Sequence, residues 1–262
     1  MGELTTTTKG AVAELSDTNW AMPDINPQNI LSTRLYLMQG LSELVSEGKA
    51  KLGDIVKSTT GEIVCPKGEA IEMLPLMVRE YWLLFKRVGG KYEFSGVESL
   101  AADNINGPLD FVRDGLEYKR DRSLDVYMLL KADIRREAEA LKKVAEGMYP
   151  DPDDCLMPVV VSFRRTSFRA GKEIITQCAK AAAFSAPPFT KSILLSAEVE
   201  KNDSGTYAVF KKIAGGTMST VEELKVCKKW YDIIHQTNAK PPVIDPEANV
   251  VTVDSSEERA KF

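Results

Sequence analysis

The strand pattern of this chain is clearest in SLDVYMLLK, residues 123–131, where apolar and polar side chains alternate. The even-numbered residues from 124 to 130 are all apolar, whereas the odd-numbered positions include Asp125, Tyr127 and Lys131. Because successive side chains of a strand point to opposite faces, this pattern predicts a strand with one face in the core and a more polar face outside.

Further elements are predicted downstream of this strand. Asp133 can cap a helix that runs to about Glu146, and MPVVVSFRR (residues 157–165) is strongly β-forming. Thr166 or Ser167 can cap a second helix, which ends before Pro187-Pro188. Strands are predicted over 189–200 and 205–214 with a KNDSG hairpin turn between them, and Ser219 opens a last helix with Glu222 at a capping-box position.

The upstream half is less regular. Residues 31–38 predict a strand, 41–47 a helical turn, and 51–64 two short extended pieces. Residues 69–87 predict two strands or one long bent strand, since Pro75 interrupts the run. Residues 95–121 are irregular and polar and are interpreted as a long surface loop.

From about residue 69 onward the predicted order is strands, a helix on one side, strands, a helix, two strands and a helix. Three strands, a helix and then a hairpin is the order of an OB barrel. We therefore predict an α+β fold, an OB-like and partly open antiparallel β-barrel elaborated with helices, although other α+β folds share this order. The 262 residues, 44% of them apolar, are enough for a sizeable core. The predicted organisation is a flexible acidic segment over 1–30, one domain over 31–237, and a mobile acidic tail over 238–262.

The residue content argues against an enzyme. His235 is the only histidine, and the chain contains no GxSxG, Walker-type phosphate loop, HExxH or GxGxxG motif. A carboxylate- and metal-dependent nuclease stays open, because its acidic ligands would be scattered in sequence.

No cofactor and no metal are expected, since the four cysteines form no CxxC pair and are interpreted as reduced thiols. No stretch reaches the length of about 20 apolar residues that spans a bilayer, and the N-terminus has no apolar signal core. We therefore expect a cytoplasmic protein with no membrane partner.

Basic and aromatic residues recur together along the chain. Single-stranded nucleic acid needs cations that follow its phosphates and flat rings that stack on its bases, so these segments predict a nucleic-acid site. The alternative interpretation is that the rings fill the core and the charges are simply solvated. The candidate nucleic-acid-binding residues are Arg79, Tyr81, Phe85, Arg87, Tyr127, Lys131, Arg164, Arg165, Arg169, Lys172, Tyr207 and Lys211.

Two blocks of sequence resemble a known family. The first runs from LYLMQGLS (35–42) through EGKAKLGDI (47–55) and the TGE turn (60–62) to IEMLPL (71–76). The second is PVVVSF (158–163) with Thr166-Ser167 and Gly171-Lys172, closed by EKNDSGTY (200–207). Over residues 30–215 the chain resembles the single-stranded-DNA-binding proteins of tailed phages, an OB-fold group.

The resemblance implies binding of single-stranded DNA, without sequence preference, during phage replication and recombination in the host cytoplasm. The matching positions carried over are Ser162, Thr166, Ser167, Lys172, Lys201 and Tyr207. Relatives place a cysteine cluster in the central loop, whereas residues 95–121 contain no cysteine, so no structural zinc is expected.

The chain's end suggests a protein partner. Single-strand binders often carry an acidic tail that ends in Phe and recruits replication enzymes; here Arg259 and Lys261 precede the terminal Phe262. We predict these three as partner-binding residues. Similar proteins of some lytic podoviruses assist transcription, so the alternative function is a phage transcription cofactor that recruits a phage or host RNA polymerase through this tail.

Overall fold

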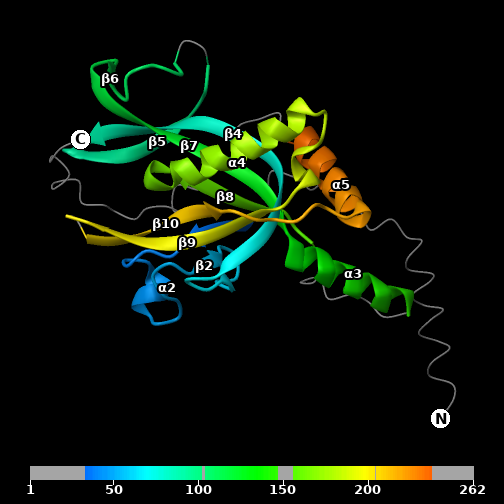
Figure 1. The fold of residues 1–262 in the computed structure, drawn as a ribbon. Helices are drawn as coiled ribbons and strands as arrows, with labels where there is room; N and C mark the ends of the chain where they lie inside the picture. The colour runs from blue at the N-terminus through cyan, green and yellow to red at the C-terminus, as the bar shows by residue number, and fades with distance from the viewer. Residues whose placement is uncertain (1–32, 102–103, 147–155, 204, 238–262) are drawn as a thin grey trace, which may run out of the picture.

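The computed structural model describes residues 33–101, 104–146, 156–203 and 205–237, which form a mixed α+β fold around one curled, open sheet (Figure 1). The strands are β1 (Thr33–Leu37), β2 (Ile55–Lys57), β3 (Ile63–Cys65), β4 (Ala70–Val88), β5 (Lys91–Ser99), β6 (Asp110–Arg113), β7 (Leu116–Leu130), β8 (Val159–Arg164), β9 (Ile193–Asn202) and β10 (Gly205–Ile213). The helices are α2 (Glu43–Ser46), α3 (Lys131–Ala145), α4 (Phe168–Ala183) and α5 (Val221–Thr237), with short 3₁₀ turns η3 (Arg165–Ser167) and η4 (Pro188–Thr190).

The predicted terminal segments, 1–30 and 238–262, lie outside the described residues, and with them Arg259, Lys261 and Phe262. No helix in the described part of the chain is both long and apolar enough to cross a membrane.

The sheet has the strand order β10-β9-β4-β7-β8-β1-β2-β3, with β5 added beside β4 and β6 beside β7. All neighbouring strands run antiparallel except β1 and β8, which are parallel. The α+β class expected from the sequence is therefore confirmed, together with the curled and partly open form of the sheet.

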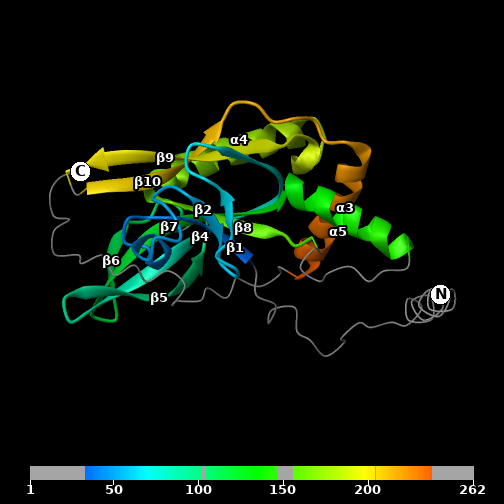
Figure 2. The same cartoon turned by 90° about the horizontal axis from the view of Figure 1, so that it is seen from below.

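Strands β4 and β7 are long, with 19 and 15 residues, and each pairs with different strands along its length. The first residues of β4, Ala70–Met73, pair with β9, whereas Tyr81–Val88 pair with β5. The start of β7 likewise pairs with β6, and its second half pairs with β8. We call the four-stranded extension made by β5, β6 and the adjoining halves of β4 and β7 the arm. The arm and the β9–β10 hairpin extend toward the same side of the molecule, with α3 and α5 on the opposite side (Figures 1 and 2).

The arm corrects the prediction of a long surface loop over 95–121. The structure places the end of β5, all of β6 and the start of β7 in this range. Asp114 and Gly115 make the β6–β7 turn with φ values of 52° and 75°, a conformation that Gly and Asp tolerate best. Most residues of β6 and of the start of β7 are exposed, so the polarity that indicated a loop belongs to a solvated hairpin.

Other boundaries differ in smaller ways. Residues 70–88 form one strand with an irregular register between Pro75 and Met77, which is the second of the two predicted possibilities. The capping box of α5 joins Thr220 and Glu223, so the prediction of Ser219 with Glu222 was one residue off.

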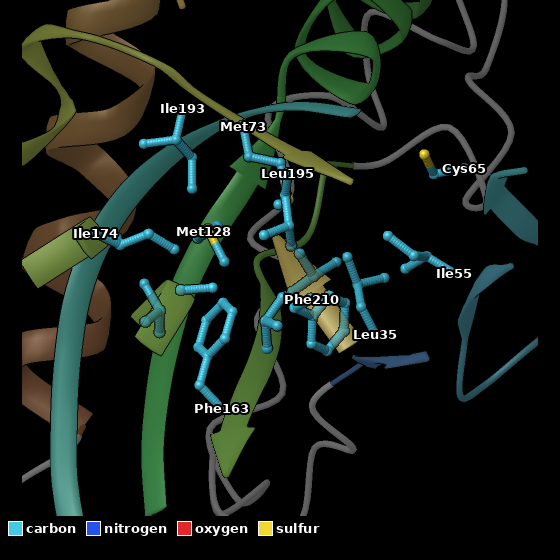
Figure 3. Close-up of a cluster of buried hydrophobic side chains, with 14 of the residues drawn as sticks. Leu35, Ile55, Cys65, Met73, Met128, Phe163, Ile174, Ile193, Leu195 and Phe210 are labelled. Carbon is cyan, nitrogen blue, oxygen red and sulfur yellow. The ribbon is translucent and has the colours of Figure 1, made fainter. Parts of the chain in front are cut away.

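The main core lies inside the curl of the sheet, where α4 packs across β7 and β8. Phe163 and Phe210 meet edge to face with ring centres 5.4 Å apart, and Met128, Ile174 and Leu195 surround them (Figure 3). The even-numbered residues of β7, 124 to 130, all belong to this core, as the alternation predicts.

Helix α4 approaches the sheet closely at Gly171. A Cβ at this position would lie 2.5 Å from Cδ2 of Leu124 and 2.8 Å from Cβ of Phe163, so only a glycine fits without displacing the core.

A second core covers the opposite face of β4, β7 and β8. Leu74, Leu129 and Val160 contact Cys227 and Ile234 of α5 there. The odd-numbered face of β7, which the sequence predicts to be the polar one, is therefore apolar toward its C-terminal end.

The curl brings the β1 end of the sheet to the free edge of β10. The Gln39 side chain donates from Nε2 to the Ala208 carbonyl and accepts from the Ala208 N–H, both at 3.0 Å. The Ser167 hydroxyl accepts from the Phe210 N–H at 3.0 Å. Side chains thus satisfy backbone groups of β10 where a fully closed barrel would have a neighbouring strand.

Candidate nucleic-acid interface

The arm has two faces, and one of them continues the inner side of the curled sheet, where the main core lies. Register pairs Trp82 with Arg122 and Leu84 with Arg120, and alternate residues of a strand share a face. Arg120 and Arg122 therefore lie on the same face of β7 as the core residue Leu124. We call this the inner face of the arm.

The outer half of the inner face holds stacked rings and arginines. Phe111 and Tyr118 stack with ring centres 5.5 Å apart and an interplanar angle of 15°. The Arg120 guanidinium carbon lies 4.3 Å from the centre of the Phe111 ring, and that of Arg113 lies 5.3 Å from Phe111 and 5.8 Å from Tyr118. Both cations therefore lie within cation–π distance of an aromatic face.

The same arrangement continues from the base of the arm onto α4. The guanidinium carbon of Arg122 lies 5.9 Å from the Trp82 ring and 5.6 Å from the Phe168 ring, and Lys172 Nζ lies 5.2 Å from Phe168. We call the whole set the cation–ring ladder: Phe111, Arg113, Tyr118, Arg120, Trp82, Arg122, Phe168 and Lys172.

Two carboxylates face the ladder. Glu98 of β5 accepts from Arg113 through Oε1 at 3.3 Å, and its Oε2 lies 2.9 Å from Nε and 2.8 Å from Nη2 of Arg120. Glu80 of β4 forms an ion pair with Arg122. Three of the ladder's four cations pair with these two carboxylates, so the ladder keeps an excess of positive charge.

The members of the ladder differ in exposure, and this separates contact residues from supporting ones. The side chains of Arg113 and Arg122 are 47% and 33% exposed, and Lys172 is exposed, so all three are open to a ligand. Arg120 and Trp82 are buried. Trp82 donates its indole N–H to the Asn104 side chain at 3.3 Å, which helps to hold the ring in place.

Further bases gather where β8 passes into α4. Arg165 is 58% exposed, has a φ of 44°, and forms an ion pair with Asp121 at 3.2 Å. Arg169 is 89% exposed and pairs with Glu173 at 3.3 Å.

The pKa of Lys211 on β10 is raised mainly by its hydrogen bond to Glu198, and the nearby Arg169 opposes this rise. Of these predicted residues, Lys172 belongs to the ladder, and Arg165 and Arg169 lie close to Phe168 in the chain.

A second group of predicted residues lies on the other face of the sheet. Arg79, Tyr81, Phe85 and Arg87 share one face of β4, as the alternation predicts. Tyr81 pairs with Ser123, which in turn pairs with Arg164 of β8, so this row crosses three strands.

Two of the predicted rings on this face, Tyr81 and Tyr127, are not available for stacking. Tyr81 is 3% exposed and Tyr127 is 8% exposed, and burial raises the pKa of Tyr81 to about 12. The interpretation of Tyr81 and Tyr127 as stacking rings is corrected by this burial, since a base cannot reach either face of a ring packed in the protein. Tyr127 belongs to the second core, where it contacts the apolar side of α5.

Lys131 also proves to be a structural residue. It begins α3 rather than ending β7, and its side chain is 8% exposed. Its ammonium group contacts Glu223 at 3.0 Å, Thr217 at 2.8 Å and Glu72 at 3.5 Å. The predicted phosphate contact is therefore replaced by a buried network that joins β4, α3 and α5.

The remaining predicted residues have mostly internal partners. Phe85 meets Phe94 edge to face at 6.0 Å, and Arg87 pairs with Glu117 at 2.6 Å. Arg164 donates to Ser123 at 3.1 Å, and Tyr207 donates to Glu200 at 3.1 Å. These four lie away from the ladder in the structure.

The carried-over serines have structural contacts as well. Ser162 donates to the fully buried Asp125 at 2.6 Å and accepts from Arg34 at 2.8 Å. Arg34 in turn contacts Asp125 at 3.3 Å, so that the buried carboxylate is paired. Ser167 supports the edge of β10, as described above.

The candidate set from the sequence shares only Lys172 with the ladder and omits its other members: Trp82, Phe111, Arg113, Tyr118, Arg120, Arg122 and Phe168. A signal was present in the alternation of Tyr118, Arg120 and Arg122, which places a ring and two cations on one strand face. Because residues 95–121 are interpreted as a loop, no strand is predicted there, and the alternation cannot be assigned to a strand face.

The described residues contain no group of three or more His, Cys, Asp or Glu side chains that could hold a metal ion. Cys65 and Cys227 are buried and Cys178 is half-buried, all as free thiols, and burial raises the pKa of each. Cys155 lies outside the described ranges.

Comparison with known proteins places the chain in one family. No curated protein and no solved structure matches it significantly. The family model described as Pam3 phage gp34-like protein matches residues 24–240, which include every described strand and helix. A match of this extent shows the family: the chain belongs to the Pam3 phage gp34-like proteins.

Proposed function

We propose that this protein binds single-stranded DNA without sequence preference and serves phage replication and recombination. The observation that carries the proposal is the cation–ring ladder, in which Arg113, Arg122 and Lys172 are open to solvent and each lies over an aromatic ring. Membership in a phage family agrees with a role in the phage life cycle.

The physical argument is that a single strand exposes both phosphates and base faces. Cations spaced along a surface attract the phosphates, and rings beside them accept bases at about 1–3 kcal/mol per stacked base. A ring stacks on any base, so a ladder of this kind binds without reading sequence. A duplex hides its base faces and offers only phosphates.

The connectivity of the sheet supports an OB-like assignment. The order β4, β7, β8, α4, β9, β10 gives three antiparallel strands, a helix and a hairpin, and β9 returns to pair with β4. The arm then replaces the loop between the first two barrel strands, and the β9–β10 turn corresponds to the loop between the last two. In OB folds these two loops flank the nucleic-acid site, and here both extend to the same side of the molecule (Figure 1).

The test is a titration of a labelled oligo-dT with the full-length protein, followed by fluorescence anisotropy at several salt concentrations. We expect tight binding at low salt and an affinity that falls steeply as salt rises, because phosphate contacts release counterions. A duplex of equal length should bind more weakly. Equal affinity for duplex and single strand, or no binding at low salt, would contradict the proposal.

A further inference from the structure

Two carboxylates, Glu98 and Glu80, lie among the cations of the ladder, although the cation–π contacts do not need them. Glu98 contacts both Arg113 and Arg120, and Glu80 contacts Arg122. Both acids are partly exposed, with 25% and 27% of their side chains open to solvent. Glu98 therefore lies beside the open Arg113, where a ligand phosphate would approach, whereas Glu80 lies at the buried Nε of Arg122 and offsets part of the charge of that guanidinium.

We infer that Glu98 and Glu80 determine specificity for single strands over duplexes; this inference rests on the proposed function. A phosphate that approaches Arg113 must compete with the bound Glu98, and one that approaches Arg122 meets a guanidinium whose charge Glu80 partly offsets. Competition of this kind weakens every contact that depends on phosphate alone. Stacking on Phe111, Tyr118 or Phe168 is not affected by it.

The consequence differs for the two forms of DNA. A single strand gains stacking in addition to its phosphate contacts and can offset the displaced ion pair. A duplex, with its bases paired and stacked internally, has only the phosphate term. Glu98 and Glu80 therefore weaken the binding of a duplex more than the binding of a single strand. Repulsion between each carboxylate and a phosphate also weakens duplex binding.

The experiment compares wild type, Glu98→Gln and Glu80→Gln in their Kd for oligo-dT and for a duplex of equal length. Glutamine keeps the shape and one hydrogen-bond acceptor but removes the charge. We expect duplex affinity to rise about tenfold in each variant and oligo-dT affinity to rise only about threefold, since the net worth of a partly exposed ion pair is modest. The salt slope for the duplex should steepen by about one phosphate contact.

The matched control is Glu117→Gln. Glu117 lies on the same arm and pairs with Arg87, but both residues belong to the face opposite the ladder. The control makes the same change of net charge, so it should leave the ratio of single-strand to duplex affinity unchanged.

Several outcomes decide the inference. An equal rise for both ligands, or an equal effect of Glu117→Gln, would show a general charge effect and overturn it. Unchanged affinities in both Glu98→Gln and Glu80→Gln would also overturn it. Glu98→Gln leaves the buried Arg120 without its partner. If that variant does not fold, Glu80→Gln alone is compared with wild type. If wild type itself fails to bind oligo-dT, it is the proposed function that fails, and the two failures are thereby distinguished.

Discussion

Arg122 of β7 and Phe168 of α4 lie with the guanidinium carbon 5.6 Å from the ring centre, although 45 positions separate them in the chain. This contact joins the rings and cations of the arm to the start of α4. It depends on α4 crossing the barrel interior close to β7, which Gly171 permits. The proposed interface therefore depends on the packing of the core.

Arg122→Ala should weaken oligo-dT binding about tenfold, because it removes an open cation and the support of the Phe168 ring. Its salt slope should fall by about one. Arg87→Ala is the control, since Arg87 is an exposed arginine on the opposite face of the arm. Anisotropy titration measures both, and an equal loss in Arg87→Ala would show that only net charge matters.

Phe168→Leu should weaken oligo-dT binding about five- to tenfold, since it keeps an apolar side chain but removes the stacking surface. Tyr92→Leu removes an exposed ring from the opposite face of the arm and should have little effect. The Kd values are compared after thermal unfolding has shown that both variants are folded. Similar Kd values for Phe168→Leu and wild type would remove Phe168 from the interface.

Gly171→Ala should lower the free energy of unfolding by about 1–3 kcal/mol, because its methyl group would collide with Leu124 and Phe163. Gly40→Ala is the matched control, as nothing lies within 4 Å of its Cβ position. Urea unfolding measures both. A stable Gly171→Ala protein would mean that α4 can shift away from the sheet at little cost.

Lys131→Met should lower the free energy of unfolding by about 3 kcal/mol and leave the affinity for oligo-dT unchanged. The substitution leaves Glu223, whose side chain is 12% exposed, and Glu72, whose side chain is 26% exposed, without their cation. Urea unfolding and anisotropy titration test the two parts separately. A specific loss of DNA binding in a stable variant would restore Lys131 to the interface.

The Glu72 carboxylate should make stability depend on acid pH. Burial opposes ionisation of Glu72, but hydrogen bonds from Ser192 and Thr217 and the charge of Lys131 outweigh it and lower its pKa to about 2. A group whose pKa is lowered by folding stabilises the protein above its unfolded pKa, and the contribution is lost as pH falls toward the folded pKa.

Between about pH 5 and pH 2 the wild-type protein should therefore lose about 2 kcal/mol of stability through Glu72. Glu72→Gln should start less stable at neutral pH and lose less on acidification. Urea unfolding at several pH values in this range compares them, and parallel pH profiles for the two proteins would show that Glu72 contributes nothing to the acid response.

The alternation of residues 123–131 determined by itself that β7 has a core face, because a strand's period of two is local and any buried sheet face must be apolar. The order of strands and helices likewise determined the α+β class. The local pattern also placed Arg79, Tyr81, Phe85 and Arg87 on one face of β4.

Only the tertiary structure decided which polar side chains face solvent. Tyr127 and Lys131 have the same residue types as surface contacts, but α5 and Glu223 reach them from distant parts of the chain and bury them. Long-range packing also creates contacts: the packing of α4 against β7 brings Arg122 and Phe168 together. Which rings and charges meet is a matter of long-range packing, and sequence periodicity reports the face of a strand without reporting what covers it.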